Sequence, residues 1–123
     1  MRIRDKVKKP QRPVVAYEIL PPREKDGTLN SYAKTISSLL SQTHIDAINI
    51  PEVHDELARG NRPVQNQLRG EPREFGRLLQ DIVGVEAIVN RVVVHESHEF
   101  QMKWFEETNI DFEIENMIIV GGE

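Results

Sequence analysis

The chain has 123 residues, which suits one domain with a hydrophobic core. Charged residues make up 29% of it and hydrophobic ones 38%, a globular composition that excludes fibrous and disordered classes. It has no cysteine, which excludes disulfide scaffolds, thiol catalysis and cysteine-ligated metals. The net charge of −4 weighs against nucleic acid, and no run reaches the ~20 apolar residues of a membrane span. Because the amino terminus also lacks a signal-peptide stretch, we expect a cytoplasmic protein without nucleic-acid or membrane partners.

Residues 1–12 form a basic leader that carries six lysine and arginine side chains. Such a segment is either a solvated leader or first helix, or an arm that binds an anionic ligand. The sequence leaves both interpretations open.

The first half of the chain predicts two strands joined by a helix. Residues 14–20 are an apolar run closed by two prolines, which is typical of a strand buried in a parallel sheet. After a loop, helical spacing predicts a helix over residues 29–41 with Thr28 as its N-cap. A second strand covers residues 45–50. The polar stretch of residues 52–70 is longer than ordinary loops and should be functional, mobile or partly helical.

The second half continues the alternation. Its predicted elements are a helix over residues 72–83, a strand over 87–95, a helix opening at Ser97 or His98, and a strand over 117–120. In the third helix, Trp104 and Phe105 should pack on the sheet rather than stack on a ligand.

The order βαβαβαβ predicts an α/β fold with a parallel sheet. Four such units are half of a (β/α)₈ TIM barrel, and the sequence stops directly after a strand. We therefore expect residues 1–123 to form the N-terminal half of one barrel domain. The alternative is a small, open four-stranded α/β domain.

Polar residues follow or end all four predicted strands, where barrels build their active sites. Glu18 lies inside the first apolar run, where an unpaired carboxylate is costly. It is either a proton donor or ligand contact, or a structural glutamate paired with Arg23 or Arg91. Asn49 ends the second strand, His95 the third, and Gly121, Gly122 and Glu123 follow the fourth.

Two further sequence patterns are candidates for a metal site and a ligand-binding site. His95, Glu96 and His98 are close in sequence, but their spacing is not that of a known metal motif, so we expect no metal site. Gly121 and Gly122 either form a tight turn or let a phosphate or planar ring approach the backbone.

Together these motifs resemble the methylenetetrahydrofolate reductase family over nearly the whole chain. The string YEILPPR at residues 17–23 is similar to the signature of that family's first strand. Residues 46–50 (DAINI) and 116–123 (NMIIVGGE) are similar to its second and fourth strands.

The resemblance implies a (β/α)₈ flavoprotein of one-carbon metabolism and methionine biosynthesis. Its flavin, FMN or FAD, takes a hydride from NAD(P)H and passes it to 5,10-methylenetetrahydrofolate. Glu18 would be the catalytic acid, and Asn49 and Glu123 would contact the folate substrate. The cofactor-binding residues would be His95, Gly121, Gly122 and Glu123. The protein would act as a homo-oligomer or with a partner subunit.

Three departures from the family pattern weigh against flavin binding. Pro51 stands where the family usually has a small hydroxyl residue, and Gly121 stands where it has an arginine. The third strand ends in Val94, His95 and Glu96 instead of the family's usual residues. Two alternatives therefore stay open: a folate- or pterin-dependent methyl transfer protein, and a non-redox binding subunit on the same barrel.

Overall fold

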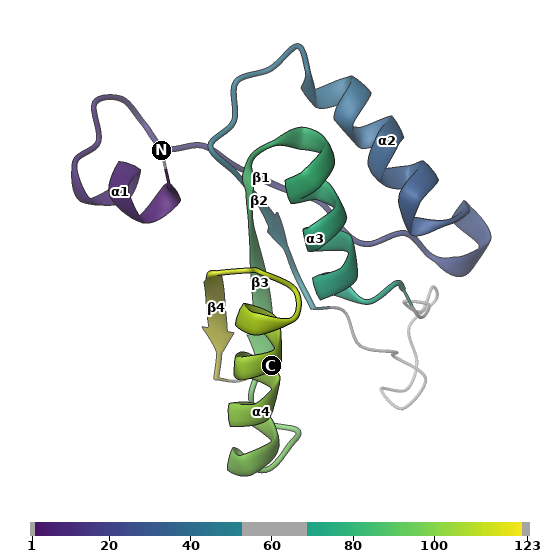
Figure 1. Ribbon diagram of the computed structural model, residues 1–123, viewed down its shortest axis with the longest axis vertical. Helices are drawn as coiled ribbons and strands as arrows, with labels where there is room; N and C mark the ends of the chain where they lie inside the picture. Colours follow the sequence, from purple (N-terminus) through teal and green to yellow (C-terminus); the bar gives the residue numbers. More distant parts are fainter. Residues whose placement is uncertain (1, 53–68, 122–123) are drawn as a thin grey trace, which may run out of the picture.

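The computed structural model describes residues 2–52 and 69–121. In chain order its elements are α1 (Ile3–Lys8), β1 (Ala16–Glu18), the 3₁₀ turn η1 (Glu24–Asp26), α2 (Leu29–Leu40), β2 (Ala47–Ile50), α3 (Pro72–Val83), β3 (Glu86–Val92), α4 (His98–Ile110) and β4 (Asn116–Val120). The four strands form one parallel sheet in the order β1-β2-β3-β4 (Figure 1). The predicted α/β class and parallel sheet are thus confirmed.

The helices begin and end where their capping residues predict. Thr28 accepts a hydrogen bond from the Ser31 amide at the start of α2, and Ser97 accepts one from the Phe100 amide at the start of α4. Helix α3 starts at Pro72 and ends at Gly84, whose φ of 82° is the left-handed conformation that glycine adopts easily. No helix among residues 2–52 and 69–121 is long and apolar enough to cross a membrane.

The strands differ more from their predicted bounds than the helices do. Strand β1 covers three residues instead of residues 14–20, and β3 ends at Val92 instead of reaching His95. Strand β2 starts at Ala47 and not at residue 45. The side chain of Asp46, directly before it, hydrogen-bonds to Lys6 and Arg12. Prolines limit β1 and β2 at their carboxyl ends, since proline has no N–H for the strand ladder.

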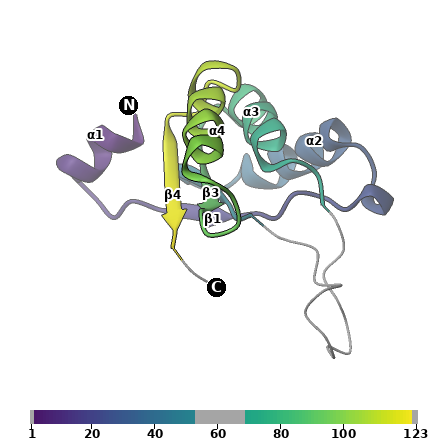
Figure 2. The ribbon, with the colours of Figure 1, turned by 90° about the horizontal axis from the view of Figure 1, so that it is seen from below.

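Helices α2, α3 and α4 lie together on one face of the sheet (Figure 2). The core between them is formed by Ile19, Ala33, Leu40, Ile48, Ile50, Phe75, Leu79, Ala87, Val89, Trp104 and Ile114. Gly76 brings α3 close to the sheet: a Cβ there would lie 3.2 Å from Ile50 Cδ1 and 3.3 Å from Ala87 Cβ. The expected packing role of Trp104 is confirmed, because its side chain belongs to this core.

Helices α2, α3 and α4 leave the opposite face of the sheet uncovered, and we call it the open face (Figure 2). Helix α1 contacts this face at its amino end, where the Ile3 amide donates to Glu86 Oε1 at 2.7 Å. All three residues of β1 are exposed; Tyr17, which shares the helix side with its register partner Ile48, is 52% exposed. The prediction of a buried first strand was therefore wrong. Its apolar run matches a buried strand, but within the described parts of the chain β1 is an edge strand, paired with β2 alone.

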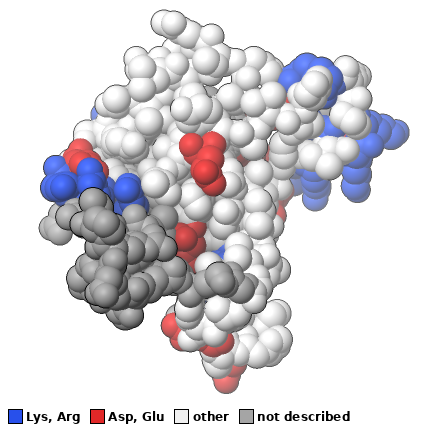
Figure 3. Space-filling view, turned by 180° about the vertical axis from the view of Figure 1, so that it is seen from behind, with Lys and Arg blue, Asp and Glu red and all other residues white. Residues whose placement is uncertain are grey.

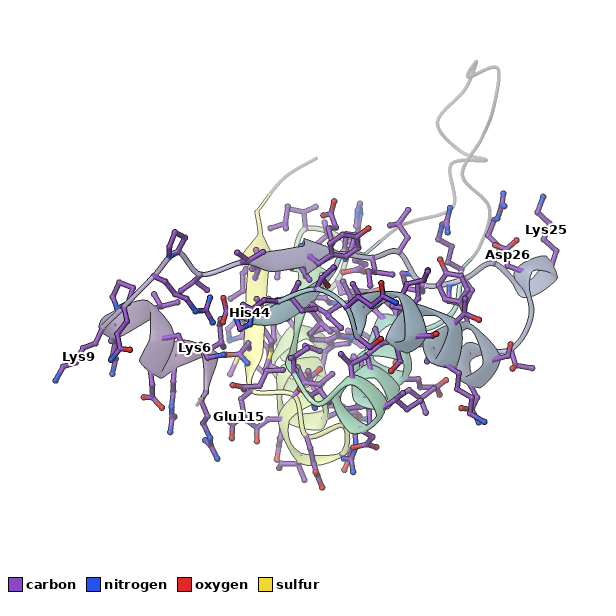
Figure 4. The ribbon with its side chains drawn as sticks, turned by 90° about the horizontal axis from the view of Figure 1, so that it is seen from above. Lys6, Lys9, Lys25, Asp26, His44 and Glu115 are labelled. Carbon is purple, nitrogen blue, oxygen red and sulfur yellow. The ribbon has the colours of Figure 1, made fainter. Side chains whose placement is uncertain are left out.

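Helix α1 anchors the basic leader to the amino ends of the strands. Lys6 Nζ lies 3.0 Å from Asp46 Oδ1, Arg12 Nη2 lies 2.8 Å from the same atom, and Arg2 Nη1 lies 2.8 Å from Glu115 Oε2. Figure 4 shows Lys6 directed from α1 toward the sheet near His44, whereas Lys9 points away from it. These contacts favour the interpretation of this segment as a first helix, because part of its charge is neutralised within the chain.

Candidate functional site

Glu18 and Asn49 are neighbours on the open face at the carboxyl ends of their strands. They are register partners of β1 and β2, and Asn49 Nδ2 lies 3.4 Å from Glu18 Oε1. Residues in register on parallel strands point to the same side of the sheet. Since Ile48 and Ile50 face the helices, Asn49 and its register partner Glu18 face the open side. The structure thus brings together two of the residues that the sequence singled out.

The structural alternative for Glu18 was an ion pair with Arg23 or Arg91, and neither pair is formed. Arg23 Nε lies 3.0 Å from Asp26 Oδ2, and Arg91 Nη1 lies 3.1 Å from Glu52 Oε1. Arg91 also lies on the helix side of the sheet, against the Trp104 ring at 4.6 Å. Among the described residues, Asn49 is the polar side chain that Glu18 contacts.

Asn90 adds a third polar side chain to this face, and our sequence reasoning missed it. It lies on β3 between Val89, which belongs to the core, and Arg91, so alternation turns its side chain to the open face. The sequence held a signal for it, because the Asn90 carboxamide interrupts the predicted apolar strand over residues 87–95 as Glu18 interrupts the one over residues 14–20. Asn90 was passed over because it does not lie at a strand end.

The two asparagines share an unusual feature. Asn49 Oδ1 and Asn90 Oδ1 are both buried, and neither has a hydrogen-bond partner within the described parts of the chain. An unpartnered buried acceptor costs roughly 1–3 kcal/mol. Asn49 contacts the Glu18 carboxylate, and both asparagine oxygens keep an unused capacity to accept from an N–H donor.

Glu52 follows β2 and has a structural role that the sequence did not show. Its Oε2 accepts a hydrogen bond of 2.8 Å from the Val92 amide, and its Oε1 pairs with Arg91. Both side chains of the ion pair are about nine-tenths buried, at 12% and 11% exposed. Glu52 therefore ties the end of β2 to the end of β3.

The remaining predicted residues are not gathered around Glu18 in the part of the chain that the structure describes. His95 lies in an exposed bend beyond the end of β3, not at the strand end as expected. Gly121 follows β4, and a Cβ added there would meet no atom within 4 Å, so close packing does not require this glycine. Gly122 and Glu123 lie outside the described residues.

The strand residues of the open face include no basic side chain. Its strand residues, taken from the register, are Ala16, Glu18, Ala47, Asn49, Glu86, Ile88, Asn90, Val92, Asn116, Ile118 and Val120. None of these is Lys or Arg, which would pair with a flavin phosphate. Figure 3, seen from behind the view of Figure 1, shows acidic side chains near the middle and basic ones toward the sides. The strand residues of the open face therefore offer no cation to the phosphate of a flavin nucleotide.

The described residues contain no group of three or more His, Asp or Glu side chains arranged to hold a metal ion. His95, Glu96 and His98 are all exposed.

Comparison of the chain with models of protein families and with curated proteins gives no match.

Proposed function

We propose that this chain binds a reduced folate on its open face, in a barrel enzyme of the methylenetetrahydrofolate reductase type. Glu18 is the proton donor in this proposal. The observation that carries it is the set of three polar groups on the open face: the Glu18 carboxylate and the unpartnered carbonyl oxygens of Asn49 and Asn90.

The chemistry of a pterin ring suits these groups. Its fused amino-oxo-pyrimidine presents several N–H donors in one plane, and carboxylate and carboxamide oxygens accept from such donors. Binding the ring would give the two asparagine oxygens the partners that they lack. The exposed apolar side chain of Ile118, on the same face, offers contact to the flat surface of the ring.

The strand order supports a barrel over a doubly wound sheet. In a doubly wound sheet the strand order reverses and helices cover both faces. Here the order is consecutive, β1-β2-β3-β4, and α2, α3 and α4 share one face. This is the arrangement of successive βα units in a (β/α)₈ barrel, whose inner wall would be the open face.

The proposed role of Glu18 is general acid catalysis. Its carboxyl group would give a proton to one of the two ring nitrogens that hold the methylene carbon of 5,10-methylenetetrahydrofolate. The bond from that nitrogen to the methylene carbon breaks, and the other nitrogen keeps the carbon as an iminium ion. A ligand lying on the open face would exclude water from Glu18, a condition that favours this proton transfer.

A second candidate is a folate-binding protein that does not use a flavin, either a methyl transfer protein or a binding subunit. The observation that favours it is the absence of Lys and Arg among the strand residues of the open face. In the first candidate, a flavin reduced by NAD(P)H would supply the hydride. None of the described residues is proposed to hold that flavin.

Calorimetric titration with 5-methyltetrahydrofolate tests folate binding directly. We expect saturable binding by the wild-type chain and a loss of roughly tenfold or more in Asn49→Leu, which keeps the size but removes the amide. The matched control is Asn109→Leu, an exposed asparagine on α4. No binding by the wild-type chain, or equal losses in both variants, would contradict the proposal.

Titration with FMN separates the two candidates. Visible absorption bands that shift on saturable binding support the reductase. Folate binding without FMN binding supports the second candidate.

A further inference from the structure

A separate cavity of about 400 Å³ lies at the carboxyl ends of the strands, on the helix side. It opens between the start of α3 and the first turns of α4, and its wall includes the rings of Phe100 and Trp104. Three arginines, Arg69, Arg73 and Arg91, also line it.

Two of these arginines are already neutralised inside the chain. Arg73 Nε lies 3.1 Å from Glu71 Oε2, and Arg73 Nη1 lies 3.4 Å from Glu107 Oε2. Arg91 pairs with Glu52. Both guanidinium groups also lie against the Trp104 ring, at 4.8 and 4.6 Å from its centre. Their position is therefore explained without a ligand.

Arg69 differs from the other two. Its side chain makes one hydrogen bond, from Nη1 to the Pro21 carbonyl oxygen at 3.0 Å, and it has no carboxylate partner among the described residues. Its Nε is buried and has no acceptor there. A charged donor without an acceptor is costly to bury, so this guanidinium has the capacity to bind an anion.

The backbone around Arg69 is fixed by the segment that follows β1. Residues Arg23 and Arg69 form an antiparallel bridge, and the Gly70 amide donates to the Pro22 carbonyl oxygen at 2.9 Å. A Cβ on Gly70 would lie only 2.5 Å from Leu29 Cδ2, so glycine allows this close approach. Arg69 is thus held in the cavity wall by contacts of its own.

We propose that Arg69 forms an oxyanion-binding site in this cavity, for a carboxylate or phosphate group. The planar guanidinium is the side chain best matched to such groups. The partly exposed ring of Phe100 provides an apolar surface for the part of the ligand that carries the anion. Glu96, exposed and also lining the cavity, lowers the affinity by like-charge repulsion.

The single tryptophan of the chain, Trp104, makes the site measurable. We would titrate the whole chain with inorganic phosphate and with acetate while recording Trp104 fluorescence. Saturation by phosphate alone identifies a phosphate site, and saturation by acetate identifies a carboxylate site. Either supports the proposal. No saturable change with either anion overturns it.

Substitutions of Arg69 test its role in anion binding. Arg69→Met should weaken binding at least tenfold, whereas Arg4→Met, an exposed cation on α1 at the other end of the sheet, should leave it unchanged. Circular dichroism shows whether Arg69→Met folds. If it does not, Arg69→Lys takes its place, because lysine keeps the positive charge. Arg69→Lys should bind the anion more weakly than wild type. Unaltered binding in a folded Arg69 variant overturns the proposal.

Glu96→Gln tests the sign of the ligand charge. It should bind the anion at least as tightly as wild type. Loss of the fluorescence signal in a folded Glu96→Gln variant would mean that the carboxylate supports the binding that it should oppose, and the proposal would be wrong. None of these measurements uses a folate, so their failure would not bear on the role of Glu18.

Discussion

Lys6 in α1 and Asp46 at the start of β2 form an ion pair of 3.0 Å that joins the amino-terminal helix to the sheet. The Asp46 carboxylate is almost fully buried, at 1% side-chain exposure, and it also accepts from Arg12 and from the Val15 amide. The Asp46 side chain therefore binds three residues of the amino-terminal segment: Lys6, Arg12 and Val15.

Replacing this carboxylate should destabilise the fold. In Asp46→Asn the amide cannot match the charges of Lys6 and Arg12, and it brings donors to a site that holds only donors. We expect a clear fall in the midpoint of thermal unfolding, measured by circular dichroism. Asp81→Asn is the matched control, because Asp81 is exposed and its pair with Arg77 lies on the surface of α3. Equal effects in both variants would contradict the anchoring role.

Asp46 should also make the stability depend on acid pH. The Arg12 guanidinium, followed by the Val15 amide, holds the pKa of Asp46 well below its ordinary value. Because the folded-state pKa is depressed, the stabilisation is present above the unfolded-state pKa of about 3.9 and is lost as the pH falls below it. The gap in unfolding midpoint between wild type and Asp46→Asn should therefore narrow from pH 5 toward roughly pH 2. A gap that widens on acidification would contradict this account.

Because α3 lies close to the sheet at Gly76, we expect alanine at this position to lower the stability of the fold. Gly76→Ala gains about 1 kcal/mol of helix propensity, but its Cβ would crowd Ile50, Ala87 and Ile114 at 3.1–3.3 Å. Since overpacking costs roughly 1–3 kcal/mol, we expect a net loss of about 1 kcal/mol in the free energy of unfolding. Urea denaturation measures it. Gly121→Ala, with open space around its Cβ, should be neutral. A stabilised Gly76→Ala would show that this contact is loose.

Asn90 should contribute to folate binding. Asn90→Leu removes the unpartnered oxygen, so the free chain should become no less stable, whereas its affinity for 5-methyltetrahydrofolate should fall several-fold. If Asn90 binds the ligand, the substitution therefore lowers the affinity for 5-methyltetrahydrofolate without lowering the free energy of unfolding. A large fall in stability with affinity retained would assign Asn90 a structural role.

Much of the fold could be predicted because its signals are local. Pro72 and Gly84 mark the ends of α3, and the predicted range of residues 72–83 is the observed one. Thr28 and Ser97 likewise mark where α2 and α4 begin. Strand bounds were less predictable because they depend on neighbouring strands: among the described residues β1 pairs with β2 alone, and its ladder covers three residues.

The site could be predicted only in part. Glu18 and Asn49 were found because a polar residue in an apolar strand is visible in the sequence, and their contact follows from the parallel register. The partners of the arginines could not be foreseen. Glu52 and Arg91 are 39 residues apart, and only the fold brings them together. The same holds for Arg69, whose lack of an acceptor is a property of the folded chain.

The most direct test of the proposed function is Glu18→Gln in the whole protein, assayed for reduction of 5,10-methylenetetrahydrofolate. The account predicts a fall in kcat of roughly 10²-fold or more, with 5-methyltetrahydrofolate still bound and the unfolding midpoint unchanged, since Glu18 is exposed. Glu106→Gln, an exposed glutamate on α4, should retain full activity. A Glu18→Gln enzyme with wild-type kcat but a lowered unfolding midpoint would contradict the account, because Glu18 would then be a structural residue.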